Sequence, residues 1–159
     1  MIRRRVLEMM LGIGVVGLGA RRGGAEGPVK TFEVTMTEAE WRQRLTPVQF
    51  TVLRKHGTER PGSSPLDKEY GPGTYHCAGC ELPLFSSDTK FDSRTGWPSF
   101  WAPLPDAVGT ATDRSLLMIR TEVHCRRCGG HLGHVFDDGP KPTGLRYCIN
   151  GVALVFRRA

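Results

Sequence analysis

Five cysteines carry most of the chemistry that this sequence could perform, and their spacing divides them into two kinds. Four form two Cys-x-x-Cys pairs, Cys77 with Cys80 and Cys125 with Cys128. Such a pair lets a tight turn present two thiolates to one ion, and four thiolates suit the tetrahedral coordination of zinc in closed structural sites. The two pairs therefore predict one structural zinc ion.

Other interpretations of the two pairs remain open. In an exported protein they could form two disulfides. A Cys-x-x-Cys pair can also be a thioredoxin-like redox motif, although no βαβ pattern surrounds either pair here. Iron could replace zinc, because four thiolate ligands do not distinguish the two metals.

The fifth cysteine, Cys148, lies in the segment 145–149, which is predicted to be a strand. Because side chains alternate along a strand, Arg146 and Cys148 should share one face, with Asn150 beside them if the strand continues. A guanidinium near a thiol lowers its pKa. This pattern indicates an activated nucleophile, and a buried structural cysteine is the alternative.

Two histidines and an aromatic stretch could complete a site around Cys148. His131 and His134 titrate near neutrality and could act as general acids. Residues three apart on a regular strand face opposite ways, but Gly133 could kink this one. The stretch 91–101 (FDSRTGWPSFW) contains Trp97 and could form an aromatic wall for a sulfur-containing group, or simply pack in the core.

Two short helices are predicted ahead of these residues. Thr37 with Glu40 and Thr46 with Gln49 form capping boxes, the second followed by a proline at the first helical position. The second helix should end at Gly57. The side chains expected to be buried are Trp41, Leu45, Phe50 and Leu53.

Beyond a turn-rich loop at 57–73, glycine and proline separate short extended segments, which predicts a mainly antiparallel β domain. The segment Val152–Phe156 is apolar throughout, as in a strand covered on both faces. The eight strands are predicted at 74–77, 83–86, 99–102, 108–112, 116–123, 130–136, 145–149 and 152–157.

Residues 1–25 have the composition of an export signal. Arg3-Arg4-Arg5 precedes the apolar run 9–20, which is too short to cross a bilayer comfortably, and Gly23-Gly24-Ala25 offers small residues for cleavage. The arginines imperfectly match a twin-arginine signal. We expect export to a bacterial periplasm, and an uncleaved membrane anchor is the alternative.

The net charge of +6 could suggest a nucleic-acid partner. However, residues 1–25 hold five arginines and one acid, so the charge falls to +2 without them. The basic character thus belongs mainly to the predicted signal, and nucleic-acid binding is not expected.

The motifs KFDSRTGWPSFW, GHLGHVFDDGP and GLRYCINGVAL, together with the two cysteine pairs, closely resemble those of the B-type methionine-R-sulfoxide reductases. The resemblance runs from about residue 37 to the C-terminus. It implies a reductase domain at 37–159 after a lead-in segment at 26–36. It also implies two antiparallel β-sheets with small N-terminal helices and a structural zinc ion on the four paired cysteines.

The resemblance also implies the roles of single residues. Cys148 matches the nucleophile that attacks the sulfoxide sulfur and becomes a sulfenic acid. His131 and His134 match the residues that bind and protonate the sulfoxide oxygen, and Trp97 matches the aromatic that holds the substrate methyl group. Arg146 and Asn150 match residues that shape the site and favour the thiolate.

One position departs from many family members, which carry a resolving cysteine where this chain has Thr95. We therefore expect an external thiol, such as a thioredoxin-like protein or a small thiol, to reduce the sulfenic acid. The expected substrates are oxidised proteins carrying methionine-R-sulfoxide, and the enzyme is expected to be a monomer. A zinc-stabilised binding module is the alternative function.

Overall fold

The structure is a computed structural model that describes residues 31–159. The predicted export signal at 1–25 and the start of the lead-in segment lie outside the described residues, so both stay predictions. Within 31–159, none of the helices has the length and apolar character needed to cross a membrane.

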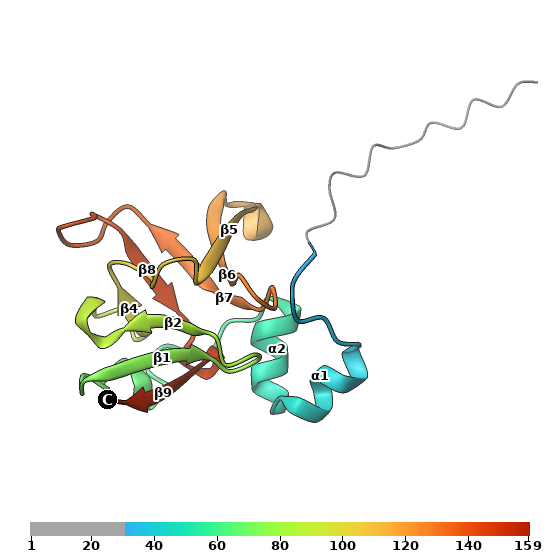
Figure 1. Ribbon diagram of the computed structural model, residues 1–159. Helices are drawn as coiled ribbons and strands as arrows, with labels where there is room; N and C mark the ends of the chain where they lie inside the picture. The colour runs from blue at the N-terminus through green and yellow to red at the C-terminus, as the bar shows by residue number, and fades with distance from the viewer. Residues whose placement is uncertain (1–30) are drawn as a thin grey trace, which may run out of the picture. The chain divides into compact units, whose positions relative to one another are not determined.

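Two short helices precede the strands, α1 (Glu38–Arg44) and α2 (Pro47–Lys55) (Figure 1). Both begin at the predicted capping boxes, where the side chains of Thr37 and Thr46 each accept a backbone N–H from the third helical residue. Helix α2 ends two residues before Gly57, because His56 takes the left-handed conformation that a glycine usually supplies. The four side chains expected to be buried are all buried.

Nine strands form two antiparallel sheets within the described residues, which confirms the mainly β fold. The three-stranded sheet has the order β2-β1-β9, and the six-stranded sheet has the order β3-β4-β8-β7-β6-β5. Their bounds are β1 (Gly73–Cys77), β2 (Pro83–Ser86), β3 (Lys90–Phe91), β4 (Ser99–Phe100), β5 (Val108–Asp113), β6 (Arg120–Cys125), β7 (His131–Phe136), β8 (Arg146–Ile149) and β9 (Leu154–Arg158).

Three strand predictions needed correction. Strand β3 was missed, since two residues carry no alternation. The segment predicted as a strand from 116 begins only at Arg120, after a 3-10 turn at Ser115–Leu117. The last strand, β9, begins only at Leu154. It is an edge strand and is not covered on both faces, because Val155 is 42% exposed.

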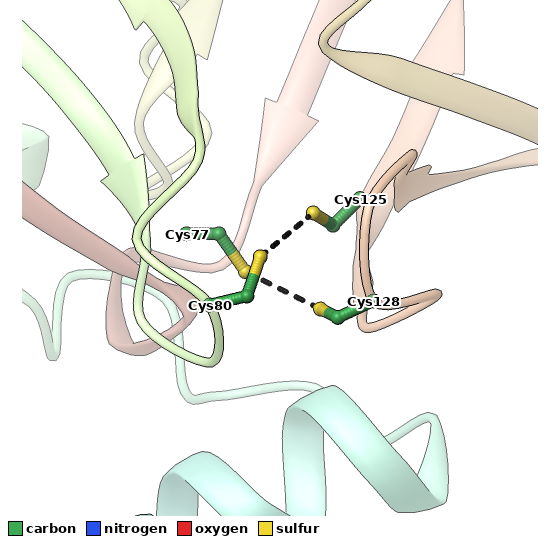
Figure 2. A group of neighbouring side chains, drawn as sticks. All are labelled: Cys77, Cys80, Cys125 and Cys128. Carbon is green, nitrogen blue, oxygen red and sulfur yellow. Dashed lines mark hydrogen bonds between the residues drawn. The ribbon is translucent and has the colours of Figure 1, made fainter. Parts of the chain in front are cut away.

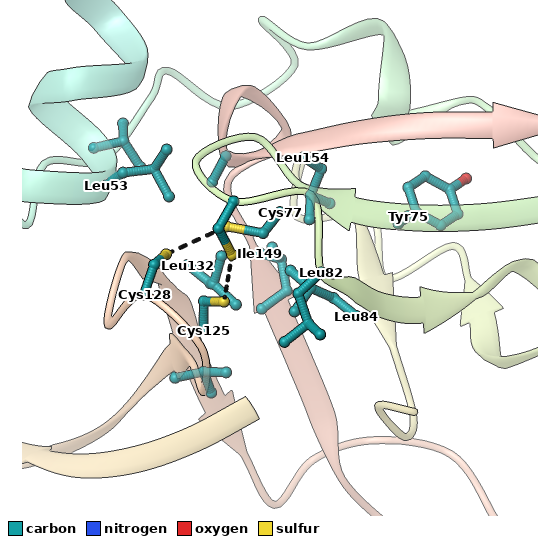
Figure 3. Packing of buried hydrophobic residues seen from close by; sticks show 14 of the residues in the cluster. Leu53, Tyr75, Cys77, Leu82, Leu84, Cys125, Cys128, Leu132, Ile149 and Leu154 are labelled. Carbon is teal, nitrogen blue, oxygen red and sulfur yellow. Dashed lines mark hydrogen bonds between the residues drawn. The ribbon is translucent and has the colours of Figure 1, made fainter. Parts of the chain in front are cut away.

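Aromatic side chains join the two sheets. Phe85 on β2 stacks on Phe100 of β4 with ring centroids 4.4 Å apart, and Tyr75 on β1 meets the same Phe100 ring edge-on at 4.9 Å. Helix α2 packs against β7 and the turn before β9. Figure 3 shows Leu53 of α2 close to this packing, which holds the strands that carry the candidate site.

Candidate active site and metal site

The four paired cysteines converge between the two sheets, as predicted (Figure 2). The Sγ atoms of Cys77 and Cys128 lie 3.7 Å apart, and those of Cys80 and Cys125 lie 3.5 Å apart. Zinc–sulfur bonds of about 2.3 Å arranged tetrahedrally place neighbouring sulfurs about 3.8 Å apart. This donor set therefore fits a metal ion with small adjustment.

The cluster is closed and contains no disulfide. All four thiols are buried, and all five cysteines of the chain are free. Each pair lies on a turn, closed at the second pair by the backbone N–H of Gly129, which donates to the carbonyl of Cys125. The first pair follows β1 and the second links β6 to β7, so a bound ion would fasten one sheet to the other. The interpretation as two disulfides is wrong for this structure.

Cys148 lies in a different environment, an open cavity of about 130 Å³. In β8 it is paired with Ser99 on β4 and with His134 on β7, and directly paired residues of neighbouring strands place their side chains on one face. The residues that line the cavity are Thr58, Trp97, Arg120, Gly133, His134, Phe136, Cys148 and Asn150. The structure thus brings together four of the residues predicted for the site.

The predicted lowering of the Cys148 pKa is wrong for this structure. Burial raises the pKa of the Cys148 thiol above its ordinary value, although Thr95, Arg146 and Ser99 each lower it in part. The sign of the Arg146 effect is as expected, but desolvation of the thiolate is the larger contribution. Free Cys148 therefore rests mainly as a thiol at neutral pH.

Arg146 is held firmly beside this thiol. Its Nε and Nη2 atoms donate to the two carboxylate oxygens of Asp138 at 2.8 and 2.7 Å, and its guanidinium lies 4.4 Å from the centre of the Phe136 ring. The Asp138 carboxylate raises the pKa of Arg146. A bidentate pair of this kind fixes the direction of the guanidinium, so its positive charge stays near Cys148.

A chain of hydroxyl groups also reaches Cys148. Thr95 Oγ1 lies 3.8 Å from Cys148 Sγ and 2.8 Å from Ser93 Oγ, which in turn lies 2.7 Å from Ser99 Oγ. These groups can donate to a thiolate without being reducing agents themselves. The position where many relatives were expected to have a resolving cysteine is thus within contact distance of the Cys148 sulfur.

A β-bulge decides where the two histidines point. The pairing of β6 with β7 shifts between Val123 and His124, so that His124 pairs with His131 while Val123 pairs with Gly133. Leu132 is the extra residue of this bulge, and it reverses the alternation of side chains along β7. His131 and His134 therefore lie on the same face of the sheet, with ring centroids 5.4 Å apart. The kink that the sequence suggested at Gly133 is therefore a bulge at Leu132.

Only one of the two histidines lines the Cys148 cavity. His134 faces the cavity, and its Nε2 lies 2.8 Å from Oδ2 of Asp113, which also accepts from Arg120. Burial lowers the pKa of His134, against the opposing effect of Asp113. Asp113 accepts hydrogen bonds from the backbone N–H of Ser115 and from His134, and these hold the pKa of Asp113 far below the ordinary range. His134 is thus oriented by a carboxylate that stays ionised.

His131 lies behind His134 rather than in the cavity. It is only 3% exposed, its Nδ1 lies 2.7 Å from Oε1 of Glu122, and its Nε2 has no hydrogen-bond partner among the described residues. Burial alone would raise the pKa of Glu122, but the hydrogen bond from His131 and the nearby histidines lower it overall. The structure therefore separates two histidines that the sequence treats alike.

Glu59, which lies in none of the sequence motifs, positions two of the predicted residues. Its backbone N–H donates to Oδ1 of Asn150 at 2.9 Å, and its carbonyl accepts from Nε1 of Trp97 at 3.2 Å. Its carboxylate accepts from the backbone N–H groups of Gly151 and Val152. Burial raises the pKa of Glu59, and these N–H groups oppose the rise. Glu59, Asp113 and Glu122 left no local signal, because each meets its partners only through long-range pairing.

Comparison with known proteins supplies the family. Residues 45–158 match the SelR domain. Over 125 residues, or 78% of this chain and 93% of the relative, the chain is 55% identical to an Agrobacterium fabrum protein named peptide methionine sulfoxide reductase MsrB. It is 60% identical over 119 residues to the Pseudomonas syringae protein of the same name, covering 74% of this chain and 91% of the relative. It is also 50% identical over 128 residues to the chloroplastic peptide methionine sulfoxide reductase B1 of Oryza sativa, covering 80% of this chain and 60% of the relative.

Proposed function

The chain belongs to the SelR-domain family of B-type peptide methionine sulfoxide reductases, which are oxidoreductases, and we propose that it reduces methionine-R-sulfoxide to methionine. The observation that supports this most is the open cavity whose wall includes Cys148, Trp97 and His134. A protein-bound methionine sulfoxide can enter such a cavity with its side chain alone. The activity would repair proteins under oxidative stress.

In the proposed first step the Cys148 sulfur attacks the sulfoxide sulfur while the sulfoxide oxygen takes up a proton. The oxygen passes to the cysteine sulfur, so one thiol and one sulfoxide yield one sulfenic acid and one methionine. Since Cys148 rests as a thiol, its proton must leave during the attack. Arg146 stabilises the negative charge that develops on the sulfur.

The cavity walls suggest how the remaining roles are divided. Trp97 offers an aromatic face to the substrate S-methyl group. His134 handles the proton of the sulfoxide oxygen, since it faces the cavity and Asp113 orients it. Asn150 is fixed by bonds to Glu59 and to the carbonyl of Leu132. His131 does not line the cavity, so it contributes through its neighbour His134 and not by contact with the substrate.

Reactivation requires an external reductant. Two thiols from a thioredoxin-like protein or a small-thiol pool would reduce the sulfenic acid, giving a disulfide and water. The other four cysteines are grouped in their own cluster, so they do not reduce the sulfenic acid of Cys148. One turnover without reductant should leave a sulfenic acid that a dimedone probe captures. Thr95 Oγ1 lies 3.8 Å from Cys148 Sγ. The variant Thr95→Cys should therefore form an internal disulfide with Cys148 instead.

We also propose that the four-cysteine cluster holds one zinc ion and that residues 1–25 direct export to a periplasm. Elemental analysis would identify the metal, and a shortened mature N-terminus in a periplasmic fraction would support export. Retention of residues 1–25 with the membrane fraction would instead favour the anchored alternative.

The central test measures methionine formation from the separated R and S sulfoxide epimers of a blocked methionine, with dithiothreitol. We expect turnover of the R epimer alone, abolished in Cys148→Ser. If metal-replete, reduced protein turned over neither epimer, the reductase proposal would fail and a binding module would remain.

A further inference from the structure

A second group of metal-ligating side chains lies outside the four-cysteine cluster and outside the cavity of Cys148. His56, Glu122 and His131 offer two imidazole nitrogens and a carboxylate oxygen, all within 4.8 Å of one another. They come from three elements, namely the end of α2, strand β6 and strand β7. The fold thus gathers them from segments far apart in the sequence.

The two imidazole nitrogens lie close to the same carboxylate oxygen. Oε1 of Glu122 lies 3.0 Å from Nδ1 of His56 and 2.7 Å from Nδ1 of His131, and the two imidazole rings lie 5.1 Å apart. In a tetrahedral site with bonds of about 2.0–2.2 Å, donor atoms lie roughly 3.3–3.6 Å apart. The two distances to Glu122 therefore need to lengthen by only several tenths of an ångström to admit an ion.

Two of the ligands are fixed and one is free to make this adjustment. His131 is buried and the Glu122 side chain is only 13% exposed, whereas the His56 side chain is 67% exposed. The backbone of His56 is nevertheless held in the left-handed conformation at φ 54°, with its N–H donating to the carbonyl of Thr51. His56 can thus turn toward an ion while staying in position.

Charge and access also suit a cation. The group opens on a cavity of about 550 Å³, which leaves room for water as a further ligand. Three basic side chains line this cavity, and two of them are neutralised, because Lys55 pairs with Glu38 and Arg120 pairs with Asp113, each at 2.7 Å; the third is Arg114. The Glu122 carboxylate therefore forms no ion pair with Lys55 or Arg120.

We propose that His56, Glu122 and His131 bind a divalent cation of the zinc, cobalt or nickel type. Two imidazoles with one carboxylate and an open position form a donor set that zinc accepts, and imidazole also suits nickel and copper. Unlike the closed four-sulfur cluster, this site faces solvent and should exchange its ion readily. An ion there would place a positive charge on His131, whose ring centroid lies 5.4 Å from that of His134.

The test counts the metal ions bound by the reduced full chain titrated with Zn²⁺ alone. The wild type should bind two ions, one tightly and one at least tenfold more weakly. His56→Asn should lose only the weaker ion, since asparagine tolerates the left-handed backbone. His76→Asn is the matched control, because His76 lies on β1 with Nδ1 3.0 Å from the carbonyl of Glu81, and it should keep both ions.

A second probe identifies the ligands. The weaker Co²⁺ ion should add absorption without the sulfur-to-cobalt bands of the thiolate cluster, and Glu122→Gln should weaken that ion at least tenfold. Equal binding by the wild type and His56→Asn, or sulfur bands from the second ion, would overturn the proposal. So would equal loss in His76→Asn.

The proposal has a consequence for activity that rests on the proposed function. Occupation of the site should lower methionine-R-sulfoxide reduction by the wild type but not by His56→Asn, whose activity without added metal should be unchanged. Since ion counting needs no catalysis, failure of the reductase proposal and failure of the metal site are distinguishable.

Discussion

The five cysteines of this chain are chemically identical side chains in two opposite surroundings. The four-cysteine cluster is buried between two sheets, and its sulfurs lie 3.5 and 3.7 Å apart in two pairs. Cys148 lies on an open cavity among a guanidinium, hydroxyl groups and an imidazole. The first arrangement favours a bound ion and offers no opening for a substrate. The second leaves the sulfur accessible, so partners and access, rather than the residue type, decide the role.

The sharpest way to break this comparison is to remove one cysteine from each region. Cys77→Ser should cost the metal ion and lower the free energy of unfolding by about 5 kcal/mol or more, because ion binding contributes to folding. Cys148→Ser should change it by about 1 kcal/mol or less and keep the metal. Metal analysis and urea unfolding would measure both. Comparable destabilisation by the two substitutions would erase the proposed division between a structural and a chemical cysteine.

The charge beside Cys148 should account for part of its reactivity. Burial raises the pKa of Cys148 and Arg146 opposes that rise, so below this pKa the thiolate fraction grows about tenfold for each pH unit. Arg146→Gln should move the alkylation midpoint to higher pH and slow iodoacetamide labelling at pH 7 by roughly tenfold. Arg157→Gln, which removes an exposed arginine from edge strand β9, is the control. An unshifted midpoint in Arg146→Gln would contradict the role of this charge.

Asp113 should matter through His134 rather than through the sulfur. Asp113 raises the pKa of His134 while burial lowers it, so Asp113→Asn should lower that pKa further and reduce the imidazolium fraction at neutral pH. The reductase rate at pH 7 should fall by about threefold to tenfold, because the alkaline limb of its pH profile moves to lower pH. The alkylation midpoint of Cys148 should stay in place. If the midpoint moved instead, Asp113 would be acting on the thiol.

A smaller effect is expected from the hydroxyl of Thr95, which acts on the thiol through one hydrogen bond, whereas Arg146 acts through both its charge and a hydrogen bond. Its contact with Cys148 is long, at 3.8 Å, yet it lowers the pKa of the thiol. Thr95→Val keeps the shape and removes the hydroxyl, so alkylation at pH 7 should slow by about threefold or less. A loss as large as that of Arg146→Gln would mean that hydroxyl groups, rather than the guanidinium, stabilise the thiolate.

Features encoded within a few residues were predictable from the sequence. The capping boxes at Thr37 and Thr46 use contacts three residues apart, and the Cys-x-x-Cys pairs are local turns. The two pairs also predicted that all four sulfurs meet at one site, and the structure bears this out. Trp97 and His134 also lie beside Cys148 as expected.

Features that depend on distant pairing could not be predicted in the same way. The bulge at Leu132 arises from the register between β6 and β7, and it decides that Glu122 meets His131. The raised pKa of Cys148 depends on how deeply the folded sheet buries it, which alternation along one strand does not reveal. Strand β9 was expected to be covered on both faces, but its position at the edge follows from topology.

The placement of the four-cysteine cluster also has a consequence for the order of folding. Cys80 and Cys125 are 45 residues apart in the sequence; Cys80 lies in the turn between β1 and β2 of one sheet, and Cys125 ends β6 of the other. Each hairpin can present two sulfurs alone, but the full set of four exists only after a long loop has closed and the sheets have docked. The rate at which a refolding chain sequesters its ion should therefore follow this late docking step rather than the formation of either hairpin.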